Sequence, residues 1–299
     1  MGVLYAFVNV ALFLLLAPLF EGVMRKITAR VQSRQGPPII QPYYDLLKLL
    51  GKERMSSVRN WAFRLAPLMA FASILTVAAL VPLGGKLNAF GGRVDAMTVV
   101  YLLTLGGVSI LLGAFAGRNT FGMIGASREM VTMIMVEPIL AMTLILGAVR
   151  MRSLGLGAAM TGAFGSGAWV SPVVMLVVYL LALQAFVAKQ PFDISEAEIE
   201  VLEGPCIEYS GPDYALFRYA MMMKQMFYAW LFVSVFVPAL RAGFVPALAV
   251  QLAGTLVVFV LIALIGSTNP RLRIDQAVKY YAVLILVALG AIGLAVKGI

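Results

Sequence analysis

The sequence contains no histidine and a single cysteine, Cys206, among its 299 residues. Without imidazole there is no usual axial ligand for haem, no zinc site of the histidine type and no imidazole base. One thiol can neither hold an iron–sulfur cluster nor form an internal disulfide. A Walker A loop and a Rossmann glycine fingerprint are also missing. We therefore expect no catalytic centre, metal or cofactor in this chain, and any redox chemistry must belong to a partner.

Charge is scarce as well. Only 12% of the residues are charged and 62% are hydrophobic, whereas a soluble domain carries about 25% charged residues. This composition predicts one all-α polytopic membrane domain, 1–299, with about eight spans, since each span needs roughly 20 apolar residues. The first window is too long for a signal peptide and lacks a cleavage-type end. The apolar windows are 2–24, 62–83, 97–117, 128–149, 170–189, 216–238, 245–266 and 277–296.

A shorter segment between the first two windows, "QPYYDLLKLLGKE", mixes leucines with charges. Leu46, Leu47, Leu49 and Leu50 alternate with Asp45, Lys48 and Lys52. This pattern predicts an amphipathic helix over 42–52, too short to cross the bilayer, that lies on its surface.

Basic residues predict the orientation of the chain. All but six of the 23 Lys and Arg fall in the loops and helix ends that follow odd-numbered windows. The six exceptions are Lys86, Arg93, Arg150, Arg152, Arg241 and Lys297. Because basic residues collect on the cytoplasmic side, both termini are expected outside and the acidic loop in the cytoplasm. The net charge of +9 reflects this bias, so nucleic-acid binding is not expected.

Two ionisable residues lie deep within predicted spans. Glu137 falls roughly 14 Å along its helix, near the middle of a hydrocarbon layer of about 30 Å, where a charge costs roughly 2.5–3.5 kcal/mol. Pro138 follows it and frees the carbonyl of Ile134, which creates a plausible water site. Lys224 lies at a similar depth. The pair either ties two helices together as an ion pair or relays protons.

Glu21 and Glu129 lie near the cytoplasmic ends of their windows. Their side chains either reach toward the interface or join the same relay.

The loop 190–215 gathers six of the 14 acidic residues within positions 193–208. Asp193, Glu196, Glu200 and Glu203 have a spacing that would place them on one face of a helix. Like charges so close cannot all ionise at low cost, so such a row could hold and pass protons. A solvated loop without such a role is the alternative.

The acidic loop also carries a family resemblance. "PFDISEAEIEVLEGPCIEYSG" resembles segments of the quinone-site membrane subunit of respiratory complex I and of its hydrogenase relatives. Three further segments agree in the same order: "RVQSRQGP" with the amphipathic helix, "GASREMVTMIMVEP", and "PRLRIDQ". The resemblance spans nearly the whole chain.

Several departures from complex I favour the hydrogenase branch, that is, formate hydrogenlyase and the energy-converting group 4 [NiFe] hydrogenases. Complex I has several more residues where Pro38, Ile39 and Ile40 stand here. Its pattern places a Glu at the positions of Met24 and Met221. These departures weigh against quinone binding.

The resemblance implies the membrane anchor and proton-coupling subunit of a hydrogen-evolving [NiFe] hydrogenase in a prokaryotic inner membrane. The implied partners are hydrogenase large and small subunits, an iron–sulfur subunit and antiporter-like membrane subunits, with the [NiFe] centre and the clusters in those partners. The implied proton pathway comprises Glu21, Glu129, Glu137, Asp193, Glu196, Glu198, Glu200, Glu203, Glu208 and Lys224. The implied docking residues for the soluble module are Arg25, Arg30, Arg34, Asp45, Arg271, Arg273 and Asp275. The position of the five arginines is equally compatible with contacts to lipid headgroups.

Three alternatives stay open. The chain could be the quinone-site subunit of a complex I-like NADH or ferredoxin dehydrogenase. It could be a stand-alone transporter, although no paired halves with broken helices are visible. It could also be a purely structural anchor.

If Glu137 and Lys224 offset each other's desolvation, exchanging the two residues should restore assembly of the complex better than either single neutral replacement does. Assembly is measured by co-purification of the partner subunits. An exchange that is worse than both single variants would show that the two residues are not neighbours.

Overall fold

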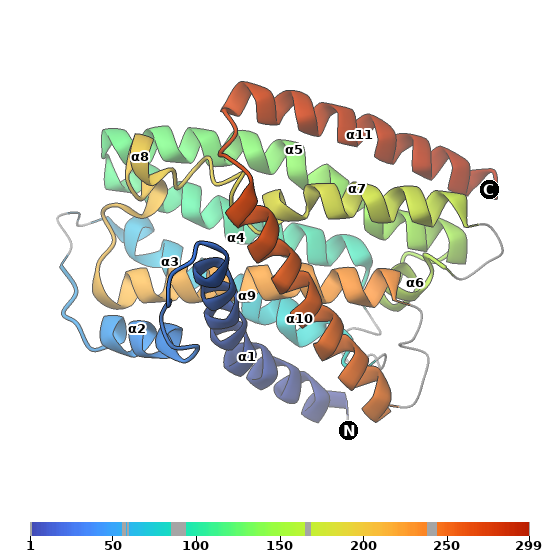
Figure 1. Cartoon of the computed structure of the whole chain (residues 1–299), viewed down its shortest axis with the longest axis horizontal. Coiled ribbons are helices and arrows are strands. Elements are labelled where there is room, and N and C mark those ends of the chain that lie inside the picture. The colour runs from blue at the N-terminus through green and yellow to red at the C-terminus, as the bar shows by residue number, and fades with distance from the viewer. Residues whose placement is uncertain are drawn as a thin grey trace.

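The computed structural model describes residues 2–55, 58, 60–84, 94–164, 169–237 and 244–298, without the side chains of positions 2, 3, 198 and 199. The described residues form helices joined by loops, and no sheet (Figure 1). In chain order they are α1 (Gly2–Val31), α2 (Gln41–Leu50), α3 (Trp61–Leu80), α4 (Ala96–Gly117), α5 (Thr120–Met151), α6 (Leu156–Thr161), α7 (Val170–Phe186), α8 (Glu198–Val201), the 3₁₀ turn η2 (Gly204–Cys206), α9 (Gly211–Phe236), α10 (Phe244–Thr268) and α11 (Ile274–Val296).

Six of these helices are long and apolar enough to cross a membrane: α1, α3, α4, α5, α10 and α11. The chain is therefore an all-α polytopic membrane protein, as its composition predicts. Two predicted windows correspond to the remaining long helices. α7 is a shorter apolar helix of 17 residues, and α9 has 26 residues and carries Arg218 and Lys224. The predicted eight membrane crossings require that α7 and α9 also cross the membrane, and this stays a prediction.

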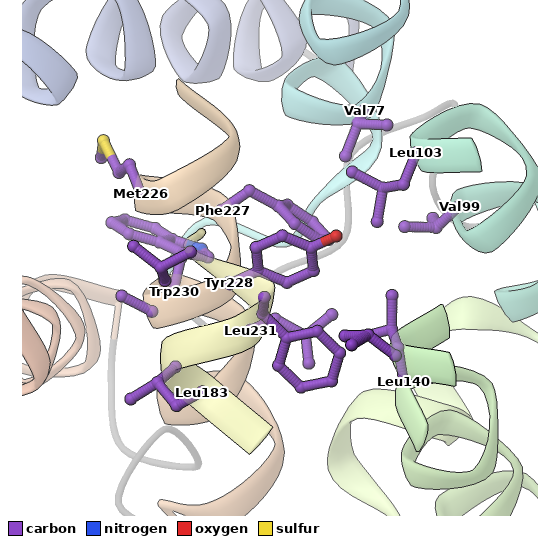
Figure 2. Packing of buried hydrophobic residues seen from close by; sticks show 14 of the residues in the cluster. Val77, Val99, Leu103, Leu140, Leu183, Met226, Phe227, Tyr228, Trp230 and Leu231 are labelled. Carbon is purple, nitrogen blue, oxygen red and sulfur yellow. The ribbon is translucent and has the colours of Figure 1, made fainter. Parts of the chain in front are cut away.

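Helix α9 is the centre of the fold. It packs against α1, α2, α3, α7 and α10, and its aromatic side chains fill the space between them (Figure 2). Trp230 and Phe227 are fully buried. Trp230 donates a hydrogen bond from Nε1 to the carbonyl of Pro82 at 3.2 Å, so the polar end of a buried aromatic is satisfied. Burial on all sides lets α9 hold polar residues away from lipid.

Two of the short helices, α2 and α8, gather with the acidic loop at one end of the bundle (Figure 1). α2 and α8 lie at the left of Figure 1, while α6 and the C-terminus lie at the right. Helix α2 confirms the predicted amphipathic segment: Leu46 is buried against the bundle, whereas Tyr44, Leu47 and Leu50 are exposed. This end of the molecule collects most of the residues with predicted functions.

Helix α5 begins at Thr120 rather than near 128, where its apolar window starts. Its first turn is capped by the Asn119 side chain, which accepts a hydrogen bond from the Phe121 N–H. Gly125 then lets the acidic loop approach closely, since a Cβ there would lie 2.7 Å from the Cα of Gly204. Hydropathy misses this extension because tertiary packing, rather than an apolar run, holds it in place.

Gly22 on α1, like Gly125 on α5, lies in close contact with the backbone of another segment, and its replacement tests the fold. A Cβ at Gly22 would lie 1.9 Å from the carbonyl oxygen of Ile39, so Gly22→Ala must displace the segment between α1 and α2. Overpacking of this kind costs about 1–3 kcal/mol, and we expect the melting temperature of the purified protein to fall by several degrees.

Gly293→Ala on α11 is the matched control, because nothing lies within 4 Å of a Cβ there. This control should leave the melting temperature unchanged or slightly higher, since alanine favours helix. Equal melting temperatures for Gly22→Ala and the wild type would contradict the packing described.

Candidate proton-transfer site

Cavities lined by charged side chains cluster where α1, α5, α7 and α9 meet the acidic loop. Four of them contain the predicted residues. The outer cavity, about 420 Å³, is lined by Glu21, Arg25, Arg34, Lys189 and Asp193, with apolar residues of α10. The middle cavity, about 50 Å³, is lined by Glu21, Glu129, Lys189, Glu196, Arg218 and Lys224. The inner cavity, about 30 Å³, is lined by Glu129, Glu137, Lys224 and Tyr228. The loop cavity, about 50 Å³, is lined by Glu196, Glu203, Tyr214 and Arg218.

Each neighbouring pair of cavities shares ionisable residues. Glu21 and Lys189 lie between the outer and middle cavities. Glu129 and Lys224 lie between the middle and inner cavities. A single water needs about 10–15 Å³ of such space, so even the inner cavity is large enough for water. The charged groups and the cavities therefore form one series that leads from the acidic loop to Glu137.

Glu21 is buried in α1, where it is held by two cations. Its Oε1 lies 3.2 Å from Nε of Arg25 and 3.4 Å from Nζ of Lys189. Arg25 also reaches Asp45 on α2, with 3.0 Å between Nη1 and Oδ2. The second oxygen of Glu21, Oε2, is buried and has no hydrogen-bond partner among the described residues. Glu21 thus faces the protein interior and does not reach toward the interface.

Glu137 lies at the inner end of the series, beside α4. The Thr104 hydroxyl is 2.8 Å from Glu137 Oε2 and 3.0 Å from the carbonyl oxygen of Val100. A hydroxyl donates only one hydrogen. It can therefore bond to an ionised Glu137, or bond to Val100 while a protonated Glu137 donates to it. The contact is compatible with both protonation states of the carboxyl group.

Lys224 and Glu129 face the same two cavities, but the ion pairs among the described residues do not include Glu137 with Lys224. The two residues share the wall of the inner cavity, so an interaction between them runs across space that can hold water. Their electrostatic coupling stays a prediction.

The predicted helical row of acids in the loop is wrong. Between Asp193 and Glu203 only Glu198–Val201 is α-helical, and the carboxylates have different partners. Asp193 pairs with Arg271 at 2.8 Å and Glu200 pairs with Arg128. The Tyr214 hydroxyl donates to Glu203 at 3.2 Å, and the Asn119 amide donates to Glu208. The side chain of Glu198 lies outside the described residues.

Backbone conformation explains why the helix stops. Leu202 and Gly204 both adopt positive φ angles, of 56° and 52°, which end a right-handed helix. A Cβ at Gly204 would lie 2.1 Å from the carbonyl oxygen of Ser195. The loop therefore folds back on itself and against α5, and the acids that the spacing would align face different cavities and partners.

Glu196 is the loop acid that faces inward. It lines both the middle and the loop cavities. Burial raises the pKa of Glu196 to about 7; the Arg218 guanidinium opposes this shift, and the negative charge of Asp193 reinforces it. Glu196 can therefore exchange a proton near neutral pH, where it connects the loop to the middle cavity.

The residues predicted to dock a soluble module divide into two groups. Arg25, Asp45 and Arg271 form the internal ion pairs already described. Arg30, Arg34, Arg273 and Asp275 are exposed and accessible to another molecule. Only the side chains of the second group are exposed in the way that docking of a soluble module requires.

Lys189, Arg218 and Thr104 line or contact the series but were not predicted from the sequence. Lys189 immediately precedes the "QPFD" segment, and Arg218 lies six residues before Lys224, so the charge of both residues was visible in the sequence. Thr104 gave none, since its role depends on the packing of α4 against α5. Among the described residues, no group of three or more metal-binding side chains is arranged to hold a metal ion.

A family model described as NADH dehydrogenase matches residues 4–296. The chain belongs to the NADH dehydrogenase family. The fold is shared with a chain of the membrane-bound sulfane sulfur reductase, an archaeal respiratory membrane complex, at a TM-score of 0.86 and 26% identity over 99% of this chain and 100% of that one.

Curated relatives of this family member include hydrogenase subunits. It is 35% identical to hydrogenase-4 component C of Escherichia coli (strain K12), over 91% of this chain and 89% of that protein. It is 31% identical to formate hydrogenlyase subunit 4 of the same organism, over 92% of each chain. A subunit of the NADH-quinone oxidoreductase of Geobacter metallireducens is 29% identical over 84% of this chain and 82% of that protein. The resemblance to the hydrogenase and complex I membrane subunits is confirmed.

The titration of Glu196 gives a stability test. A folded-state pKa of about 7 against an ordinary value of 4.5 means that the folded protein binds this proton more tightly than the unfolded chain. The ionised Glu196 carboxylate therefore destabilises the folded protein. This destabilisation is absent below the ordinary pKa and grows as pH rises toward 7. Glu196→Gln should remove it, so the gain in melting temperature over wild type should increase between about pH 4.5 and 7.

Glu200→Gln is the control for that measurement, because Glu200 is an exposed carboxylate paired with Arg128. It should show no such gain over the same pH range. A Glu196→Gln curve parallel to the wild-type curve would refute the inward-facing, protonated state.

Proposed function

We propose that this chain is the membrane anchor and proton-coupling subunit of a multisubunit, hydrogen-evolving [NiFe] hydrogenase complex. The family, and curated relatives named as hydrogenase-4 and formate hydrogenlyase subunits, support this function. The observation that carries it is the series of cavities and ionisable residues that leads from the acidic loop to Glu137.

Within this chain, proton transfer would run through its own ionisable residues and the cavities between them. Glu196 exchanges protons with the loop cavity near neutral pH. Water in the middle cavity passes them to Glu129 and Lys224, and the inner cavity leads to Glu137 beside Thr104. A cation on Lys224 lowers the cost of a carboxylate in its neighbourhood. Further membrane subunits with antiporter-like character would receive the protons.

The soluble module belongs on the side of the acidic loop. The basic loops predict that this side is cytoplasmic and that both termini are outside. The exposed Arg30, Arg34 and Arg273 would contact acidic surface of the module there. The [NiFe] centre and the iron–sulfur clusters would lie in those partner subunits, since this chain has no histidine and one cysteine.

The quinone-site subunit of a complex I-like dehydrogenase is the alternative, since subunits of that kind are also relatives. Two positions favour the hydrogenase. Met24 lines the outer cavity and Met221 lines the middle cavity, where the complex I pattern has Glu. A stand-alone transporter is less favoured because the relatives are components of larger assemblies.

The proposal is tested on the complex purified through a tag on this chain. Hydrogen evolution from a reduced low-potential donor is compared with quinone reduction by the same sample. Hydrogen evolution, with a nickel-containing large subunit present, is the result expected. Quinone reduction without hydrogen would replace this function with the complex I alternative.

Glu137→Gln separates coupling from anchoring, because glutamine still accepts the Thr104 hydrogen bond but cannot carry the proton. In proteoliposomes we expect hydrogen evolution to continue while the number of ions moved per hydrogen molecule falls severalfold. Glu53→Gln, at an exposed carboxylate outside the series, should leave that ratio unchanged. An unchanged ratio in Glu137→Gln would support a structural anchor instead.

A further inference from the structure

The outer cavity differs from the others in size and in its walls. At about 420 Å³ it has roughly eight times the volume of the middle cavity, at about 50 Å³. It lies between the ends of α1 and α10, and the exposed Arg34 is part of its wall. Its volume exceeds the roughly 30 Å³ that one water occupies in the liquid by more than tenfold. The proton series does not require so large a space.

One side of the outer cavity is apolar and the other is charged. Met24 of α1 and Ile262 and Ala263 of α10 form the apolar side. Arg34 is exposed on the charged side, and Arg25 and Lys189, which also pair with Glu21, add further positive charge. Such a division matches a molecule with a hydrocarbon part and an anionic part, because the planar guanidinium of arginine binds phosphate oxygens with two parallel hydrogen bonds.

Two acceptors at the outer cavity lack donors. Glu21 Oε2 and Asp193 Oδ1 are buried without a hydrogen-bond partner among the described residues, and both residues line the cavity. Buried polar atoms are nearly always satisfied. A ligand with hydroxyl or ammonium donors as well as an anionic group would satisfy these oxygens and match the cations.

The outer cavity lies near the ends of α1 and α10, two of the helices that are apolar and long enough to cross a membrane. Val31, at the end of α1, is exposed beside Arg30, and Leu264, near the end of α10, is exposed three residues before Ser267. The helix α10 is apolar along its length, with only a third of its most apolar window buried. Hydrocarbon chains can therefore continue from the cavity along α10, while a headgroup stays among the cations.

We propose that the outer cavity binds the headgroup of a phospholipid whose phosphodiester lies beside Arg34 and Arg25 and whose hydroxyl or ammonium group donates to Glu21 and Asp193. Phosphatidylglycerol and phosphatidylethanolamine have this chemistry; phosphatidylcholine has the phosphate but no such donor. The site depends on the membrane location of the chain and not on the hydrogenase function, so each can fail without the other.

The complex is purified through a tag on this chain, delipidated, and titrated with phosphatidylglycerol, phosphatidylcholine or inorganic phosphate, while native mass spectrometry counts the adducts. Arg34→Gln removes a cation from the cavity. Arg30→Gln is its matched control, an exposed arginine of α1 that does not line the cavity. Thr28→Trp keeps every charge but fills part of the cavity that Thr28 lines.

Wild type and Arg30→Gln should retain one phosphatidylglycerol on this subunit, with phosphatidylcholine bound more weakly. Arg34→Gln should weaken binding roughly tenfold, because it removes a charge-assisted hydrogen bond to the phosphate, and Thr28→Trp should also lose the adduct. Equal losses in Arg34→Gln and Arg30→Gln would overturn the proposal in favour of general surface charge. Displacement of the lipid by inorganic phosphate, or recovery of a quinone in its place, would overturn it too.

Discussion

The clamp of Arg25 and Lys189 on Glu21 holds together the end of the molecule where the acidic loop lies. The side chain of Glu21 is only 4% exposed, so its charge must be offset within the protein. Each cation connects Glu21 to a different segment. Arg25 of α1 also pairs with Asp45 of α2, and Lys189 directly precedes the acidic loop. One buried carboxylate thus fixes α1, the surface helix and the loop relative to one another. Removing one partner of such a buried pair typically costs about 3–5 kcal/mol.

A second constraint is the cost of charge in a hydrocarbon layer. A charge on Glu137 or Lys224 that faced lipid would be costly in free energy. Helix α9 is enclosed by other helices and places Lys224 at the inner cavity instead. Small cavities between the ionisable groups replace direct ion pairs. A direct pair would be tighter, but it would also hold each proton in place. If Glu137 and Lys224 are coupled across space for one or a few waters, as we propose, each stays free to change its protonation state.

The sequence predicted the fold class, the amphipathic helix and the family, because apolar windows and a specific acidic motif are local signals. It failed where packing decides. The start of α5 at Thr120 depends on Gly125 meeting Gly204, and no hydropathy window contains that contact. The row of loop acids followed a helical spacing that Leu202 and Gly204 interrupt. Glu21, Glu129, Glu137 and Glu196 line connected cavities, and their role in proton transfer stays a prediction. Lys189, which pairs with Glu21, and Arg218, which lines the same cavity, lie far from Glu21 along the chain, so spacing alone could not connect them.

Proton transfer as proposed requires that water join Glu196, the pair Glu129 and Lys224, and Glu137 into one series. An electron cryo-microscopy map of the intact complex, at a resolution that shows ordered water, would reveal whether it does. We expect waters in the loop, middle and inner cavities, within hydrogen-bond distance of these side chains. Cavities closed by side chains, or filled by hydrocarbon between Glu196 and Glu137, would contradict the proposed series.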